Sequence, residues 1–102
     1  MEIPSQFSEY LNTDYFSSPF AQEGHWDESS QLMLIEPVPG IENHSDIGFL
    51  QIGRPGVDGI GFGYRKGLSG IWAYYPVDDE FSFLCSSVGE LVEGWQSGRI
   101  TV

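Results

Sequence analysis

Short apolar runs separated by turn residues mark the C-terminal half of the chain. Four of these runs are rich in aromatic and aliphatic residues, and Gly, Pro or Asp residues lie in the intervals, as is typical of turns. Intervals this short suit antiparallel hairpins, because a parallel pair needs a crossover of about a dozen residues. The pattern predicts an antiparallel meander over Ile47–Gly53, Gly59–Tyr64, Gly70–Pro76 and Glu80–Leu84.

A helix is predicted directly after the meander. Ser87 and Glu90 have the S-x-x-E spacing of a capping box, in which two side chains bond the free N–H groups of a helix start. Gly98 suits the C-terminal cap. We therefore expect one helix from Val88 to about Ser97, packed on the sheet through side chains that share one face. These side chains are Val88, Leu91, Val92 and Trp95.

The N-terminal half has a weaker pattern. Ile3–Leu11 places apolar residues on one face of a short helix, and Gln31–Glu36 is a strand candidate that Pro37 ends. Asn12–Ser30 shows no sustained period, so we expect irregular surface there, anchored by Phe16, Phe20 and Trp26. Together these elements predict a single α+β domain over residues 1–102. It would be an antiparallel meander sheet of four to six strands, with a short N-terminal helix and a C-terminal helix packed on it.

Glycine alternates with large apolar residues in the second strand of the meander. One face of that strand is bare at Gly59, Gly61 and Gly63, while Ile60, Phe62 and Tyr64 fill the other. We expect the aromatic residues of the next strand to lie over the bare face. The stretch contains neither G-x-G-x-x-G nor the G-K-[ST] ending of a phosphate loop, so no nucleotide site is expected.

Composition favours a folded domain with a strongly negative surface. The chain has 102 residues, of which 40% are hydrophobic and 15% aromatic, enough for one core. Its 15 acidic residues against four basic ones give a net charge of -11, which disfavours nucleic acid and anionic membranes as partners. All nine acidic residues from Glu2 to Asp46 precede the first basic residue, Arg54. The excess either maintains solubility or attracts a basic protein.

The single cysteine, Cys85, cannot form an internal disulfide, and its neighbours Phe83 and Leu84 indicate a buried, unreactive thiol. The N-terminus lacks the pattern of a signal peptide, and no apolar run approaches the roughly 20 residues that span a bilayer. We expect a cytoplasmic protein.

Two histidines lie near carboxylates. His25 is followed by Asp27 and Glu28, and His44 by Asp46. Zinc sites take three or four convergent ligands, and neither group has the helical H-E-x-x-H spacing. We expect solvated loop residues, no catalytic or metal site, no cofactor and no enzymatic activity.

Three contiguous carboxylates occupy the turn between the last two predicted strands. They form either a solvated hairpin tip or a docking patch for a basic partner. Two further acids lie in the acidic half, and two aromatic residues of the third strand would act as binding hot spots if exposed. The candidate partner-binding residues are Asp78, Asp79, Glu80, Glu42, Asp46, Trp72 and Tyr74.

Four segments carry a family resemblance: F-L-Q-I-G at 49–53, F-G-Y at 62–64, G-I-W-A-Y-Y-P at 70–76 and S-S-V-G-E-L-V-E-G-W at 86–95. In this order they resemble the SUKH superfamily, whose members include bacterial immunity proteins and yeast cell-wall synthesis regulators. The resemblance covers Phe49 to Trp95. It implies a central antiparallel sheet flanked by helices, and a role in binding and neutralising a toxin, commonly a nuclease.

These observations lead us to expect an immunity protein that neutralises a cognate bacterial toxin of the polymorphic, nuclease type by stoichiometric occlusion. A negatively charged inhibitor would suit the basic groove of a nuclease. The alternative is a regulatory or scaffold module that acts on a host enzyme.

Overall fold

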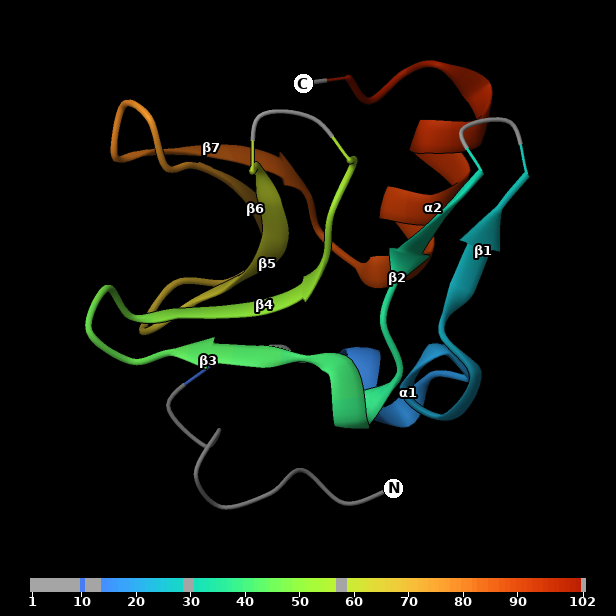
Figure 1. Cartoon of the computed structure of the whole chain (residues 1–102), viewed down its shortest axis with the longest axis horizontal. Coiled ribbons are helices and arrows are strands. Elements are labelled where there is room, and N and C mark those ends of the chain that lie inside the picture. The colour runs from blue at the N-terminus through green and yellow to red at the C-terminus, as the bar shows by residue number, and fades with distance from the viewer. Residues whose placement is uncertain (1–9, 11–13, 29–30, 57–58, 102) are drawn as a thin grey trace.

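The sheet of this protein is antiparallel throughout, in the order β1-β2-β4-β5-β6-β7, and β3 also pairs with β4. The computed structural model describes Tyr10 and residues 14–28, 31–56 and 59–101 (Figure 1). The strands are β1 (His25–Asp27), β2 (Leu32–Ile35), β3 (Glu42–His44), β4 (Phe49–Gly53), β5 (Gly61–Arg65), β6 (Ile71–Tyr75) and β7 (Glu80–Cys85). The helical segments are η2 (Asp14–Ser17), α1 (Phe20–Glu23), η3 (Val38–Gly40) and α2 (Val88–Ser97).

The predicted α+β class and the predicted meander are confirmed. Each of the four predicted runs overlaps one strand, with bounds within two residues of those predicted, and β4 to β7 pair in sequence order. The predicted helix is α2, which begins after Ser87 and ends at Gly98. The Ser87 hydroxyl accepts a hydrogen bond from the Glu90 N–H at 3.2 Å. Gly98 adopts the left-handed conformation of a C-terminal cap.

The prediction of irregular structure over Asn12–Ser30 is wrong for residues 14–28. Two short helical segments and β1 lie there, each too short to leave a periodic pattern in the sequence. Phe16 is buried as expected and Phe20 packs partly buried against the core, but Trp26 is 54% exposed, because it points to the opposite face of β1 from the buried Asp27. The predicted helix Ile3–Leu11 lies outside the described residues except for Tyr10, which is buried and forms a β-bridge with Lys66.

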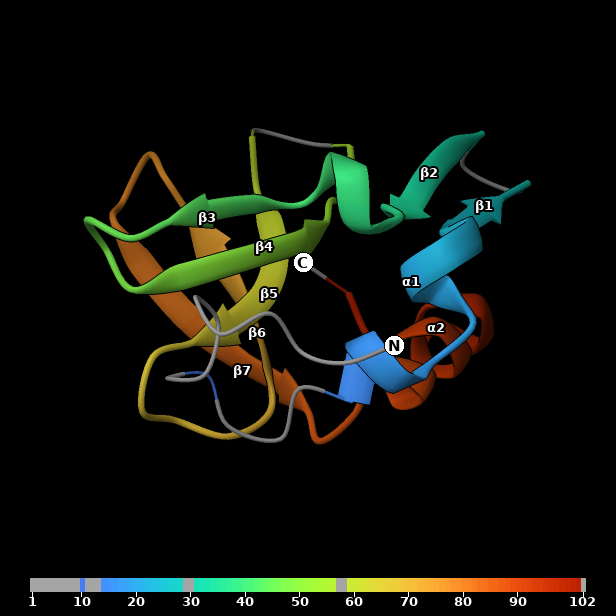
Figure 2. The same cartoon turned by 90° about the horizontal axis from the view of Figure 1, so that it is seen from below.

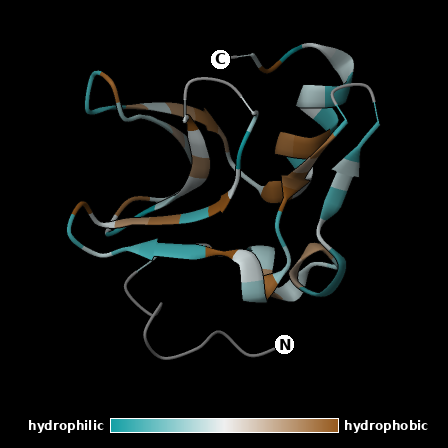
Figure 3. Ribbon diagram, in the orientation of Figure 1, coloured by the Kyte–Doolittle hydropathy of each residue, from teal (hydrophilic) through white to brown (hydrophobic). Residues whose placement is uncertain are grey.

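The strand β3 was not predicted, because its three residues are all polar. Figure 3 shows it in the hydrophilic colour beside β4. Its backbone pairs with β4 over Glu42–His44, and backbone hydrogen bonds do not depend on apolar side chains. The predicted strand Gln31–Glu36 is present as β2 and ends before Pro37.

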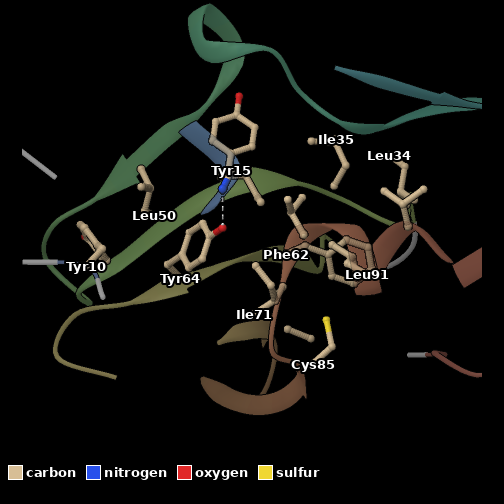
Figure 4. Close-up of a cluster of buried hydrophobic side chains, with 14 of the residues drawn as sticks. Tyr10, Tyr15, Leu34, Ile35, Leu50, Phe62, Tyr64, Ile71, Cys85 and Leu91 are labelled. Carbon is tan, nitrogen blue, oxygen red and sulfur yellow. Dashed lines mark hydrogen bonds between the residues drawn. The ribbon is translucent and has the colours of Figure 1, made fainter. Parts of the chain in front are cut away.

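The main core lies between the sheet and α2. Phe62 and Ile71 from the sheet gather with Leu91 from α2 (Figure 4). Each of these side chains is fully buried. The backbone N–H of Tyr15 donates to the Tyr64 hydroxyl at 3.1 Å, which ties η2 to the middle of β5. The faces of β5 and β6 that carry these residues are therefore closed to any partner.

The β4 to β7 ribbon curls, and α2 lies on its outer side in both views (Figures 1 and 2). Phe49 on β4 contacts Phe81 on β7, with ring centroids 5.5 Å apart, although two strands lie between them in the sheet. The glycines of β5 let β4 lie close against β5 on this side of the sheet. A Cβ atom on Gly63 would overlap the Leu50 carbonyl oxygen, and one on Gly61 would overlap the Gln51 side chain.

The bare glycine face therefore exists, but the atoms nearest to Gly61 and Gly63 belong to β4, and the atom nearest to Gly59 belongs to Pro76. We expected the aromatic residues of β6 to lie over it. Trp72 and Tyr74 are the cross-strand partners of Gly63 and Gly61 and so face the same side. The bare positions bring β4 close to β5 and leave room for side chains from β4, β6 and β7 to meet.

Candidate protein-binding face

One side of the curled sheet carries a cluster of rings separate from the main core. Residues directly opposite in an antiparallel pair point to the same side. By this register, Trp72 and Phe83 share a side, as do Tyr74 and Phe81. Phe49 lies opposite Arg65 on that side. We call this surface the aromatic face; it consists of Phe49, Arg65, Trp72, Tyr74, Phe81 and Phe83.

The rings of the aromatic face pack against one another. Tyr74 and Phe81 have centroids 4.8 Å apart, and Trp72 meets Phe83 edge-on at 5.4 Å. Among the described residues, Phe49 is the one buried apolar side chain that lies outside the main core, so the aromatic face itself covers it. At its open edge Phe83 remains 53% exposed. Packed aromatic side chains that stay partly exposed are typical of a protein-binding surface.

Arg65 lies on top of these rings. Its guanidinium carbon is 4.0 Å from the ring centroid of Phe81 and 4.8 Å from that of Trp72, both within cation–π range. The indole N–H of Trp72 donates to the Ser69 carbonyl at 3.1 Å, which holds that ring in place. Arg65, Phe49, Phe81 and Phe83 were not among the predicted partner-binding residues. Phe81 and Phe83 alternate with other residues along β7, and this spacing was the signal in the sequence that both rings lie on one side of the sheet.

One predicted acidic residue, Asp79, bonds Tyr74, and a second, Asp46, acts on Tyr74 through its charge. The Tyr74 hydroxyl donates to the Asp79 carboxylate at 2.8 Å, and this bond raises the pKa of Tyr74 above its ordinary value. Burial and the negative charges of Asp79 and Asp46 raise that pKa further. Asp46 lies in the turn between β3 and β4, and Asp79 in the turn between β6 and β7. The ends of two hairpins therefore border the aromatic face with carboxylates.

The remaining predicted acids differ in availability. Asp78 and Glu80 are exposed beside Asp79, so the hairpin tip presents all three carboxylates to solvent. Glu42 lies on β3 and pairs with Arg54 at 3.0 Å, with both side chains about half exposed. Glu42 is thus partly neutralised within the chain. The structure brings Asp79 to Tyr74 and places Trp72 on the same side of the sheet, whereas Asp46 acts on Tyr74 through its charge and Glu42 lies at a separate ion pair.

The histidine groups do not form a ligand set. Among the described residues, no group of three or more His, Cys, Asp or Glu side chains is placed to hold a metal ion. His25 lies on β1 and His44 on β3, so the expectation that both lie in loops is wrong. Asp27 is buried instead of solvated, because its carboxylate accepts a hydrogen bond from the indole N–H of Trp95 at 3.2 Å.

Cys85 is buried at the end of β7, as predicted. Its thiol donates to the Ser87 carbonyl at 3.3 Å. Burial raises the pKa of the Cys85 thiol to about 11, so the neutral form dominates near pH 7. A thiol in this form is a weak nucleophile.

None of the helices in the described part of the chain is long and apolar enough to cross a membrane. Comparisons of the chain with protein-family models, with curated proteins and with solved structures find no match. The aromatic face and its acidic border are therefore the features from which a function is inferred.

Proposed function

We propose that the protein is a binding module that captures a basic protein on the aromatic face, as an immunity protein that occludes a nuclease-type bacterial toxin. The observation that carries this proposal is the hydrogen bond from the Tyr74 hydroxyl to Asp79 at the margin of the aromatic face, with the charge of Asp46, from a second hairpin, acting on the same hydroxyl. Their carboxylates border a surface of partly exposed rings. Aromatic anchors with a charged rim are the usual anatomy of a protein interface.

The charge of the whole chain supports the same partner chemistry. A net charge of -11 steers a basic protein toward the surface and speeds association, whereas a polyanion is repelled. Toxins that cleave nucleic acid carry basic substrate grooves, and an acidic inhibitor can occupy such a groove. Occlusion needs no catalytic group, so one inhibitor would inactivate one toxin molecule.

The partner is identified by capture from the native organism, followed by purification of each captured protein and reconstitution with this chain. We expect a basic protein that forms a one-to-one complex and whose expression is toxic until this chain is co-expressed. A resident enzyme whose activity changes on binding, without toxicity, would instead support the regulatory alternative. A partner that is acidic would contradict the proposal.

Two variants with equal net charge separate local recognition from overall charge. The tip variant neutralises Asp78, Asp79 and Glu80 as Asn, Asn and Gln. The control variant changes Glu23, Glu28 and Glu93 to Gln; these are exposed residues on α1, after β1 and on α2 (Figure 1). In surface plasmon resonance against the reconstituted partner, we expect the tip variant to associate at least several-fold more slowly than the control.

Salt gives a second measure on the same complex. The association rate should fall as the Debye length shortens from about 10 Å at 0.1 M salt to about 3 Å at 1 M. The dissociation rate should change less with salt, because contacts between packed rings do not depend on charge. Equal slowing in both variants, or an association rate independent of salt, would mean that the acidic hairpin ends do not direct recognition.

A further inference from the structure

We propose that Arg65 is the anchor of the interface and binds a carboxylate of the partner, an Asp or Glu side chain, at the centre of the aromatic face. The proposal rests on the protein-binding function proposed above and adds the chemistry of one contact. It means that the partner is not uniformly basic: an acidic side chain meets Arg65, and basic side chains around it meet the hairpin carboxylates.

Arg65 has no acidic partner among the described residues, although the chain is rich in acids. Arg54 pairs with Glu42 at 3.0 Å, and Arg99 lies 3.7 Å from Glu93. In the described part of the chain, no carboxylate or other acceptor bonds the Arg65 guanidinium. The chain has 15 acidic residues against four basic ones, so an unpaired arginine is unexpected on charge alone. Its five N–H donors remain available to an external acceptor.

The carboxylate of Asp79, in the turn between β6 and β7, is held by another group. Asp79 accepts the hydrogen bond of Tyr74, the Tyr74 ring packs on Phe81, and the Phe81 ring packs under Arg65. These groups follow one another across the face, with the carboxylate at one end and the guanidinium at the other. The arrangement keeps the negative and positive groups at separate positions, so that each can meet a different group of the partner.

Stacking on the rings also preorganises the Arg65 side chain. An arginine that stacks on two rings has lost side-chain freedom before any partner arrives, so less entropy is lost on binding. Trp72 is itself fixed by its bond to Ser69 and by contact with Phe83. The planar guanidinium matches a carboxylate through two parallel hydrogen bonds. Tryptophan, tyrosine and arginine are the residues most enriched at interface hot spots, and the aromatic face contains all three.

The test is a nuclear magnetic resonance titration of the full 15N-labelled chain at low salt. The probe is N-acetyl-aspartate methylamide, which carries one side-chain carboxylate, and the matched control is the neutral asparagine analogue. We expect the aspartate probe to cause saturable shifts of the Arg65 side-chain N–H and the Trp72 indole N–H. The asparagine probe should shift them at least several-fold less at equal concentration.

Two variants of equal net charge test whether the probe shifts the Trp72 indole N–H by binding at Arg65. Arg65→Gln should abolish the saturable shift of the Trp72 indole, whereas Arg99→Gln, which loses one positive charge at an exposed position, should leave it unchanged. Arg65→Lys keeps the charge but not the planar donor pair, and should lower the affinity for the aspartate probe at least several-fold. The proposal is overturned if Arg65→Gln still shows the indole shift, or if the Arg99 N–H shifts as strongly as that of Arg65.

The outcome is separate from that of the proposed function. With the reconstituted partner, Arg65→Gln should weaken binding at least tenfold, mainly through faster dissociation, and Arg99→Gln should not. If the partner binds through the acidic hairpins but tolerates Arg65→Gln and the probe does not bind, then the protein-binding function stands and Arg65 only covers the rings. If no protein partner exists, the titration still shows whether the face takes a carboxylate.

Discussion

The carboxylate of Asp14 accepts a hydrogen bond from the backbone N–H of Val88 at 3.1 Å, although the two residues are 74 positions apart. Val88 is the first residue of α2, where backbone N–H groups have no partner within the helix. The same carboxylate accepts a hydrogen bond from the Tyr64 hydroxyl at 2.8 Å. One side chain of η2 therefore joins the start of α2 to β5, and the N-terminal segment becomes part of the core.

Asp14→Ala should destabilise the protein by about 1–3 kcal/mol, because it leaves a part-buried N–H and a hydroxyl without their acceptor. Asp14→Asn retains an acceptor oxygen and should cost less. Urea unfolding followed by tryptophan fluorescence measures both. The exposed Asp46→Ala is the control and should stay within about 0.5 kcal/mol of wild type. A loss for Asp14→Ala no larger than that of the control would mean that this contact does not stabilise the fold.

Trp95→Ala should cost about 3–5 kcal/mol, because the indole packs on the core and its ring lies 5.7 Å from that of Phe62. Trp95→Phe keeps much of the ring but removes the donor to the buried Asp27, and should cost about 1–3 kcal/mol. Thermal and urea unfolding of the two variants separate packing from hydrogen bonding. A midpoint for Trp95→Ala within a few degrees of wild type would contradict the packing described for α2.

The two glycines of β5 should respond differently to alanine. In Gly63→Ala the new methyl group meets the Leu50 backbone, which cannot move without shifting β4, so we expect a loss of about 1–3 kcal/mol. In Gly61→Ala the methyl group meets the Gln51 side chain, whose amide end can rotate away. This variant should stay within about 1 kcal/mol of wild type. Equal losses would show that the approach of β4 to β5 is not limited by the Gly63 position.

Stability should fall at alkaline pH. Burial raises the pKa values of Tyr15 and Tyr64 above 10.0, and that of Cys85 from 9.0 to about 11. The unfolded chain releases these protons more readily than the folded chain. The stabilisation is therefore complete below the unfolded pKa and is lost as pH rises through the folded one. For Cys85 this window runs from about 9 to about 11.

Urea midpoints across the alkaline range measure this loss, and ultraviolet absorbance follows tyrosinate formation. Cys85→Ala should remove the earliest part of the pH dependence, because its thiol has the lowest ordinary pKa of the three. Tyr15 and Tyr64 should ionise together with unfolding. Tyrosinate from all tyrosines at the ordinary pKa, with the fold intact, would contradict the burial described here.

His25→Ala should leave partner binding unchanged, because β1 lies at the opposite edge of the sheet from β7. His44 lies opposite Phe49 and so points to the side of the aromatic face, but we assign it no catalytic or metal role and expect His44→Ala to leave partner binding unchanged as well. Elemental analysis of protein purified without chelators should find no stoichiometric metal. Stoichiometric zinc that is lost in either variant would reveal a ligand set that the sequence does not indicate.

Local signals in the sequence were enough to predict α2 and the β4 to β7 meander. A helix cap requires Ser87, Glu90 and Gly98 within a few positions, and the turns between strands require residues that are close in the chain. The three carboxylates of the last turn were predicted to be exposed for the same reason. These features depend on neighbours that the sequence places side by side.

Features that depend on distant neighbours were decided by the tertiary structure alone. The strand β3 has no apolar side chain, and its pairing with β4 comes from the backbone. Asp27 is buried because Trp95, 68 positions away, donates a hydrogen bond to it. The contact of Phe49 with Phe81, and the place of Arg65 above Phe81, depend on how far the sheet curls. That curl is a property of the packed strands, which no single segment of the sequence encodes.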